Sequence, residues 1–264
     1  MRLRVNNTIL NVFEAGVENY NKSRPSLVFL HYFGGSSQAW TEVIDKLAAD
    51  YHCVAPDLRG FGASGEKDES YDFDCYIDDA AALISTLRLE SYVLIGHSMG
   101  GKIALALAAR EPAGLQSLVL LAASPPTPEP MPETERERLL TGYGKLSVAK
   151  TTVRKTIAET LPKEIFERAV NDNLRSSEPA WRAWLEAGSR EDISAAVEQI
   201  NIPVLVAAGE KDETITAELL ERKIVSKIKT ARLVVVPAVK HLLPLEAPQA
   251  VADIIDEQCR LISA

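Results

Sequence analysis

The sequence predicts an α/β fold: a mostly parallel central sheet with helices on both faces and a helical cap inserted between two strands. Short apolar runs alternate with longer segments of helical spacing, and this alternation is typical of parallel sheets with crossover helices. The runs are continuously apolar, as expected of strands buried on both faces. One long stretch, residues 125–200, interrupts the alternation and contains no comparable run.

The chain begins with two strand-like runs, Arg2–Val5 and Thr8–Phe13, on either side of a turn-forming Asn6-Asn7 pair, which predicts a hairpin. The apolar runs that follow predict six further strands: Leu27–Leu30, Cys53–Ala55, Tyr92–Ile95, Leu118–Leu121, Val204–Ala207 and Leu233–Val236. The segments with helical spacing are 38–49, 76–87, 100–110, 217–227 and 247–261. We expect residues 1–124 and 201–264 to form the core and residues 125–200 to form the cap.

The predicted cap opens with a proline-rich tract, residues 124–130, and continues with charged, helix-prone sequence. Its run of charges at 133–138 predicts a solvated helix start. Apolar side chains interspersed with the charges indicate amphipathic helices: Leu139, Leu140, Tyr143, Leu146, Ile157, Leu161, Ile165, Phe166, Leu174, Trp181, Trp184 and Leu185. They could roof a pocket or simply pack on the core. Trp181 and Trp184, three residues apart on one helix face, are the best candidates for substrate contacts.

Composition narrows the class of function. The chain has 264 residues, of which 46% are hydrophobic and 25% charged, with a formal net charge of −8. This charge disfavours binding to nucleic acid or to an anionic membrane and suits a small-molecule substrate. The three scattered cysteines predict neither a disulfide framework nor a metal site. The sequence shows no leader peptide or membrane span, so we expect a cytoplasmic protein, either a monomer or a homodimer.

A G-x-S-x-G motif at residues 96–100 stands between a predicted strand and an Ala/Leu-rich helix. This setting is typical of a nucleophile elbow, in which a sharp turn presents a serine at a helix N-terminus. Ser98 is therefore the candidate nucleophile, and the backbone N–H of Met99 is a candidate for half of an oxyanion hole. We expect His97 to be structural, with its side chain directed away from Ser98.

A serine hydroxyl needs a base, and the chain has four histidines. His241 follows a predicted strand in a loop, where it can reach across the carboxyl edge of a parallel sheet, and is the candidate base. The imidazole in turn needs a carboxylate, and Asp212 follows another buried strand at the same edge. Glu210 and Glu213 are its local rivals.

These features resemble the α/β-hydrolase fold superfamily across nearly the whole chain. The resemblance rests on the order Ser98, Asp212, His241 and on three further segments, residues 30–40, 57–64 and 240–248. It implies that the N–H of Phe33 completes the oxyanion hole. Tyr32 stands where the family usually has glycine, which could place an aromatic ring or hydroxyl beside the pocket. By the same resemblance His31 and Asp57 are scaffold residues.

The resemblance implies a serine hydrolase that cleaves small to medium carboxylic esters through an acyl-enzyme, without a metal or organic cofactor. A serine at the nucleophile position separates the chain from dehalogenases and epoxide hydrolases of the family, which carry aspartate there. Two alternatives remain open: a cofactor-free perhydrolase, haloperoxidase-like or lactonase activity with the same three residues, and a ligand receptor that turns over slowly.

Overall fold

The computed structural model describes residues 1–18, 24–65 and 70–263 and confirms the predicted fold class. In this part of the chain one eight-stranded sheet carries the strand order β1-β2-β4-β3-β5-β6-β7-β8. Its strands are β1 (Arg2–Val5), β2 (Thr8–Ala15), β3 (Ser26–Leu30), β4 (Cys53–Pro56), β5 (Tyr92–His97), β6 (Leu115–Leu121), β7 (Val204–Gly209) and β8 (Ala231–Val236). Each predicted strand is present, with its ends moved by a few residues at most.

The sheet is antiparallel only at its N-terminal edge. β1 and β2 form the predicted hairpin, β2 pairs with β4 in antiparallel orientation, and β3 to β8 run parallel. In the register of the central strands Leu30 lies beside Gly96, and His97 lies beside Leu121. The carboxyl ends of β3, β5 and β6 therefore meet at one edge.

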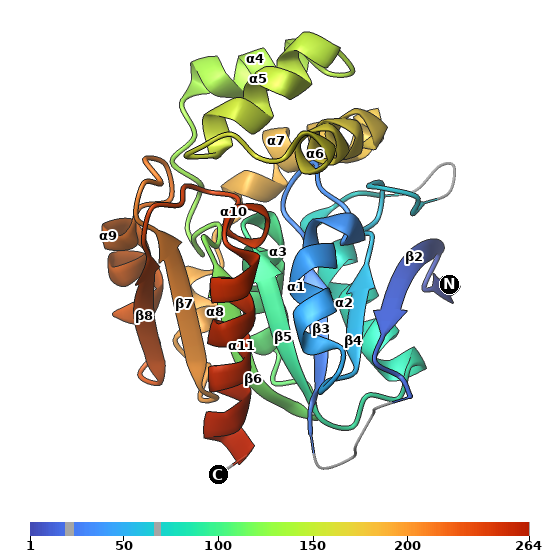
Figure 1. Cartoon of the computed structure of the whole chain (residues 1–264), viewed down its shortest axis with the longest axis vertical. Helices are drawn as coiled ribbons and strands as arrows, with labels where there is room; N and C mark the ends of the chain where they lie inside the picture. Colours follow the sequence, from blue (N-terminus) through green and yellow to red (C-terminus); the bar gives the residue numbers. More distant parts are fainter. Residues whose placement is uncertain (19–23, 66–69, 264) are drawn as a thin grey trace.

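Helices cover both faces of the sheet. They are α1 (Thr41–Leu47), α2 (Phe73–Thr86), α3 (Met99–Ala108), α9 (Ala217–Leu220), α10 (Leu243–Glu246) and α11 (Pro248–Ser263). α1 and α11 lie in front of the strands in Figure 1, and α2 and α3 lie behind them. Every residue of β3, β5 and β7 is buried, which explains their continuously apolar sequence.

Three helical segments differ from the prediction. The predicted helix 38–49 is a 3₁₀ turn, Ser37–Trp40, followed by α1. The predicted helix 217–227 is α9 followed by a π-helical turn, Glu221–Val225. α10 was not predicted, because a four-residue helix that includes Pro244 is too short to show a periodic apolar pattern.

Among the described residues, the segment between β6 and β7 contains helices joined by loops and no strand. They are α4 (Glu133–Thr141), α5 (Leu146–Thr156), α6 (Lys163–Arg175), α7 (Glu178–Glu186), a 3₁₀ turn (Gly188–Arg190) and α8 (Ser194–Val197). Figure 1 shows α4 to α7 above the carboxyl edge of the sheet, whereas α8 lies lower, in contact with α3. We call α4 to α7 the cap helices, and the division of the chain into core and cap domains stays a prediction.

One side chain of the charged run 133–138 contradicts the prediction of a solvated helix start. Arg136 is only 3% exposed, and its guanidinium donates to the Leu185 carbonyl and to Ser189 Oγ. A run of charged residues predicts solvent exposure because the sequence alone does not show which of these side chains has a buried hydrogen-bond partner. Here α7 and the following turn supply two acceptors for Nη1 of the buried guanidinium.

Polar contacts join the cap helices to the core. Arg168 of α6 donates to both carboxylate oxygens of Glu42, in α1, at 2.6 Å. Ser36 Oγ, in the loop after β3, donates to Asp172 of α6 at 2.7 Å. Among residues 1–18, 24–65 and 70–263, no helix is long and apolar enough to cross a membrane.

Candidate active site

The turn between β5 and α3 places Ser98 in a strained conformation. Its φ of 52° lies in the left-handed region, which side-chain-bearing residues seldom adopt. A Cβ atom on Gly100 would lie 2.2 Å from the Leu30 carbonyl oxygen, and one on Gly96 would lie 2.5 Å from the carbonyl oxygen of Gly100. Only glycine fits at these two positions, so the motif's glycines allow β5 and α3 to approach closely enough to form the elbow.

Three side chains from three separate loops meet in one hydrogen-bonded line. Ser98 Oγ lies 3.0 Å from His241 Nε2, and His241 Nδ1 lies 2.6 Å from Asp212 Oδ2. The second oxygen of Asp212 accepts the backbone N–H groups of Thr214 and Ile215 at 2.9 and 3.0 Å. The carboxylate is therefore held in one orientation, with one oxygen directed at the imidazole.

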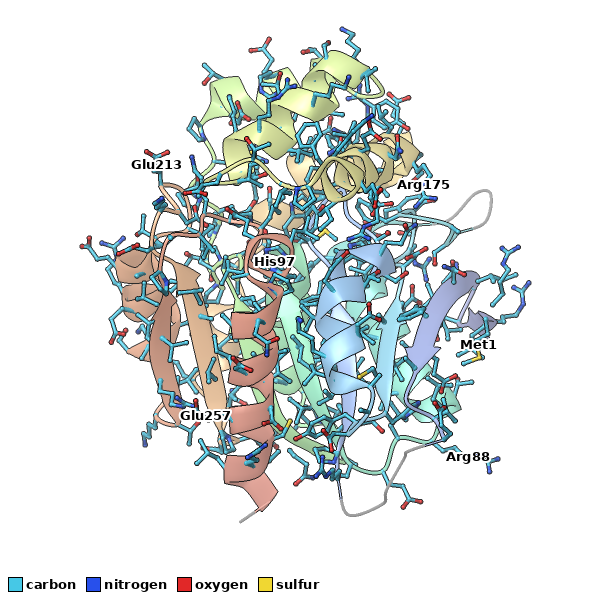
Figure 2. The ribbon with its side chains drawn as sticks, in the orientation of Figure 1. Met1, Arg88, His97, Arg175, Glu213 and Glu257 are labelled. Carbon is cyan, nitrogen blue, oxygen red and sulfur yellow. The ribbon has the colours of Figure 1, made fainter. Side chains whose placement is uncertain are left out.

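The two rival carboxylates bond to other partners. Glu210 accepts the backbone N–H of Ala238 at 2.9 Å, and Glu213 forms an ion pair with Lys240 at 2.9 Å. In Figure 2 Glu213 lies at the left edge of the molecule, level with the lower cap helices. Of the three acids in this loop, Asp212 alone bonds to His241 among the described residues.

Ionisation of the pair favours proton transfer from Ser98. Burial alone would raise the pKa of Asp212, but the hydrogen bond from His241 and the neighbouring imidazole charge lower it to about 2. Burial alone would lower the pKa of His241, but the Asp212 carboxylate outweighs it, so the pKa is raised. The carboxylate thus stabilises the protonated imidazole that would form when Ser98 loses its proton.

The backbone of His241 is held from two sides. Its N–H donates to the Thr156 carbonyl at the end of α5, and its carbonyl accepts the Nε2–H of His97. Burial lowers the pKa of His97 to about 3, so the ring is neutral and its Nε2 carries the proton for this bond. His97 lies just below the cap helices in Figure 2. Its side chain is directed at the His241 loop and helps to hold the backbone of His241 in place.

His31 and Asp57 brace the adjoining loops. His31 is fully buried and accepts the Leu58 N–H at Nε2, while its Nδ1 bonds to the Tyr32 carbonyl. Asp57 accepts the N–H groups of Ser37 and Ala63. These contacts agree with the expected scaffold role and fix the loop that presents residues 32 and 33.

Phe33 and Met99, whose backbone N–H groups we expect to form the oxyanion hole, follow the neighbouring strands β3 and β5. Met99 is the first residue of α3, where backbone N–H groups have no helical acceptor. Phe33 lies in the loop after β3, the strand that pairs with β5, and its side chain packs on Phe61 and Trp181. The two N–H groups belong to neighbouring strand ends, as an oxyanion hole needs.

A cavity of about 540 Å³ opens between the sheet edge and the cap helices, which is within the usual range for ligand pockets. Ser98, Asp212 and His241 line its floor. Its remaining lining is mainly apolar and includes Tyr32, Phe33, Met131, Leu139, Val153, Ala169, Trp184 and Ile215.

The three predicted substrate-contact residues have different locations. Tyr32 and Trp184 line the cavity. Trp181 is absent from the lining: it is 2% exposed, donates from Nε1 to the Leu139 carbonyl and packs on Phe33 with ring centroids 4.3 Å apart. Consecutive turns of α7 thus present one tryptophan to the cavity and use the other to hold the cap against the core.

Several pocket residues were not anticipated, and Glu129 is one of them. Glu129 lies in the proline-rich tract, which the sequence marked only as the entry to the cap, yet its side chain is part of the cavity lining. The sequence signal that could have identified this residue is an acid between two prolines, shortly after the strand that pairs with β5. Lys102, fully buried in α3, was also missed, and it donates to the carbonyls of Thr127 and Glu191 at the two ends of the cap segment.

The sequence profile of the alpha/beta hydrolase family matches residues 27–254. The chain belongs to this family. It is 33% identical over 217 residues to the AB hydrolase superfamily protein YisY of Bacillus subtilis. The aligned region covers 74% of this chain and 77% of that protein.

Two further similarities concern activity. A bifunctional esterase/perhydrolase of Acinetobacter calcoaceticus is 27% identical over 84% of this chain and 87% of its own length. The structure of a thermophilic esterase from Thermogutta terrifontis superposes with a TM-score of 0.86 at 25% identity and covers both chains fully. The prediction of a hydrolase with esterase relatives is confirmed.

Proposed function

We propose that the protein is a serine hydrolase that cleaves small to medium carboxylic esters through an acyl-enzyme. The observation that carries the proposal is the hydrogen-bonded line from Ser98 Oγ through His241 to Asp212, formed at the floor of a mainly apolar cavity. Family membership and the esterase relatives support the same reaction.

In this mechanism Ser98 Oγ attacks the ester carbonyl while His241 Nε2 takes its proton. The N–H groups of Met99 and Phe33 stabilise the oxyanion of the tetrahedral intermediate. His241 then donates its proton to the departing alcohol, which leaves an ester between Ser98 and the acyl group. Water, deprotonated by the same imidazole, hydrolyses this ester, and Asp212 orients the ring in both halves of the cycle.

The cavity supports an uncharged, mainly apolar acyl or alcohol portion of moderate size. Leu139 and Trp184 of the cap contribute apolar surface opposite Ser98. Exclusion of water by this surface would strengthen the hydrogen bonds that act on the intermediate.

The test is hydrolysis of 4-nitrophenyl esters from acetate to decanoate, followed over many turnovers. The wild-type protein should release many equivalents of nitrophenolate, and Ser98→Ala should lose roughly 10⁶-fold in turnover because the three residues act as a unit. Ser147→Ala, at an exposed position of α5, is the matched control. Release that stops after one equivalent would instead support a slow receptor, and more than a tenth of wild-type activity in Ser98→Ala would refute the assignment.

Perhydrolysis is the second candidate, because a relative with that activity matches 84% of this chain. The reaction would use the same acyl-enzyme, with hydrogen peroxide in place of water as the nucleophile that releases the acyl group. Bromination in a mixture of acetate, hydrogen peroxide and bromide, measured beside ester hydrolysis in the same preparation, distinguishes the two, because the peracid formed would oxidise the bromide.

A further inference from the structure

The cavity beside Ser98 carries more negative than positive charge. Its ionisable lining residues, besides His241, are four carboxylates, Glu129, Glu135, Asp212 and Glu213, and two ammonium groups, Lys155 and Lys240.

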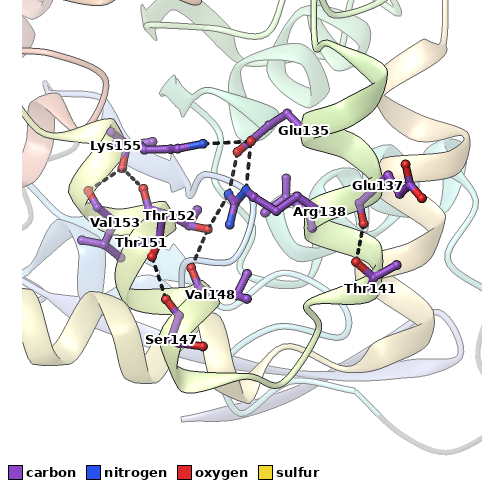
Figure 3. Close-up of polar contacts among 12 residues, drawn as sticks. Glu135, Glu137, Arg138, Thr141, Ser147, Val148, Thr151, Thr152, Val153 and Lys155 are labelled. Carbon is purple, nitrogen blue, oxygen red and sulfur yellow. Dashed lines mark hydrogen bonds and ion pairs between the residues drawn. The ribbon is translucent and has the colours of Figure 1, made fainter.

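Three of the four carboxylates already have a direct partner, which is a cation for two of them and the His241 imidazole for the third. Glu135 accepts from Lys155 at 3.0 Å and from the guanidinium of Arg138, as Figure 3 shows. Glu213 pairs with Lys240 at 2.9 Å, and the remaining Asp carboxylate bonds to the imidazole. Both lysines of the lining are thus engaged, and neither is available to an anionic substrate without breaking an ion pair.

Glu129 differs from these three. Among the described residues it forms no ion pair, and its Oε2 atom is buried without a hydrogen-bond partner. The nearby ammonium of Lys102 is turned to the carbonyls of Thr127 and Glu191, at 3.2 and 2.5 Å. Burial raises the pKa of the Glu129 carboxyl and outweighs the nearby Ser124 hydroxyl and Lys102 ammonium. Burial thus disfavours the carboxylate when no cation is bound, and a cation bound beside it would favour the carboxylate.

Glu129 faces the same cavity as the candidate catalytic residues. It lines this cavity together with Ser98 and His241, so a group bound beside the imidazole occupies the same enclosed space as the carboxyl. Aromatic side chains, including Phe33 and Trp184, line the same cavity. A carboxylate together with aromatic rings in a poorly hydrated site is a combination that stabilises a positive charge.

We infer that Glu129 makes the site selective for esters that carry a cationic group, such as a quaternary or protonated amine, over neutral esters of the same shape and over anionic ones. The inference rests on the ester hydrolysis proposed above and names its substrate class. An incoming cation would supply the partner that Glu129 lacks, whereas an incoming anion would meet an unneutralised carboxylate.

Matched esters test the inference on the wild-type protein. The acyl series consists of three 4-nitrophenyl esters. The cationic member is the ester of 4-(trimethylammonio)butanoate, the neutral member is that of its carbon isostere, 5,5-dimethylhexanoate, and the anionic member is the monoester of glutarate. On the alcohol side the comparison is choline butyrate against 3,3-dimethylbutyl butyrate, followed by titration of released acid. In at least one series kcat/KM should be about tenfold or more higher for the cation than for its neutral isostere, and lowest for the anion in the acyl series.

Two substitutions locate the effect. Glu129→Gln should reduce the cation-to-neutral ratio by about tenfold, to near one, and Glu129→Asp, which keeps the charge, should retain a preference. Glu137→Gln, at an exposed position on α4, changes the net charge by the same amount outside the cavity and should leave the ratio within about twofold. Because a ratio is measured within each variant, general losses of activity cancel.

Each outcome is decisive. Wild-type ratios near one in both series, or a preference that survives in Glu129→Gln, overturn the inference even if that variant folds poorly. An equal loss on all esters in Glu129→Gln would make Glu129 a positioning residue for His241 and also overturn it. Absence of turnover on every ester, neutral ones included, would instead reject the ester hydrolysis on which the inference rests.

Discussion

The nucleophile elbow and the cap helices are held in place by different forces. At the elbow, backbone contacts backbone: Gly100 lies against the Leu30 carbonyl, and the Ser98 N–H donates to the Leu121 carbonyl at 3.0 Å. The cap is held largely by side chains, through the Arg168–Glu42 ion pair and contacts such as that of Trp181 with Phe33, with a few backbone bonds such as that of the His241 N–H with the Thr156 carbonyl. A backbone-built elbow tolerates almost no change, whereas side-chain contacts can be exchanged, so the cap is the region where substrate preference can vary.

The largest effect on activity should follow from a change in the hydrogen-bonded line that runs from Ser98 through His241 to Asp212. Asp212→Asn keeps the shape of the side chain but can no longer fix the imidazole tautomer or stabilise its charge, so turnover should fall about 10⁴-fold. Steady-state hydrolysis of 4-nitrophenyl butyrate measures it. The rival acid supplies the control: Glu210→Gln, in the same loop, should lower turnover by less than about threefold. Similar losses of turnover in both variants would contradict the assignment of Asp212 as the carboxylate that orients His241.

A single methyl group should distinguish the two regions by stability. In Gly100→Ala the new Cβ would lie 2.2 Å from the Leu30 carbonyl oxygen, so we expect a loss of about 3 kcal/mol or more in the free energy of unfolding. Gly144, in the turn between α4 and α5, has a φ of 69°, and a methyl group added there would have no atom within 4 Å, so Gly144→Ala should cost only about 1 kcal/mol of backbone strain. Urea unfolding gives both values, and equal losses would contradict the comparison.

The acid limb of the pH–rate profile should sharpen the assignment of the base. His241 must be neutral to accept the Ser98 proton, so kcat/KM should fall as the pH drops through the raised pKa of the imidazole. Asp212→Asn removes the main group that raises this pKa, so the midpoint of the limb should move to lower pH in that variant. A midpoint that stays in place would mean that another group governs the limb.

The smallest effect should come from the cap. Arg168→Met breaks the ion pair with Glu42, whose side chains are 23% and 25% exposed, and should cost no more than about 1 kcal/mol, or about 2 °C in Tm. Thermal unfolding measures it, with Arg182→Met on the outer face of α7 as the control. A loss above about 3 kcal/mol would show that this pair, and not apolar packing, holds the cap.

Much of the core and of the site was predictable because the signals are local. The turn pair Asn6-Asn7 between two strand-like runs predicted the first two strands, apolar runs predicted the other six, and the glycines around Ser98 predicted the elbow. All three signals depend on residues adjacent in the chain. His241 and Asp212 were predictable for a related reason: they follow parallel strands, whose carboxyl ends meet at one edge. α10 was missed, because four residues carry no periodicity.

By itself, the sequence determined the α/β architecture, the elbow and the three residues that meet there, because strand periodicity, turn chemistry and parallel pairing leave little choice in where they lie. The tertiary structure alone decided which tryptophan of α7 faces the cavity, that Arg136 is buried, that His97 holds the His241 loop, and that Glu129 lines the cavity without an ionic partner. These features depend on which side chains the cap brings against the sheet edge. Such contacts join residues distant in the chain, and no local pattern encodes them.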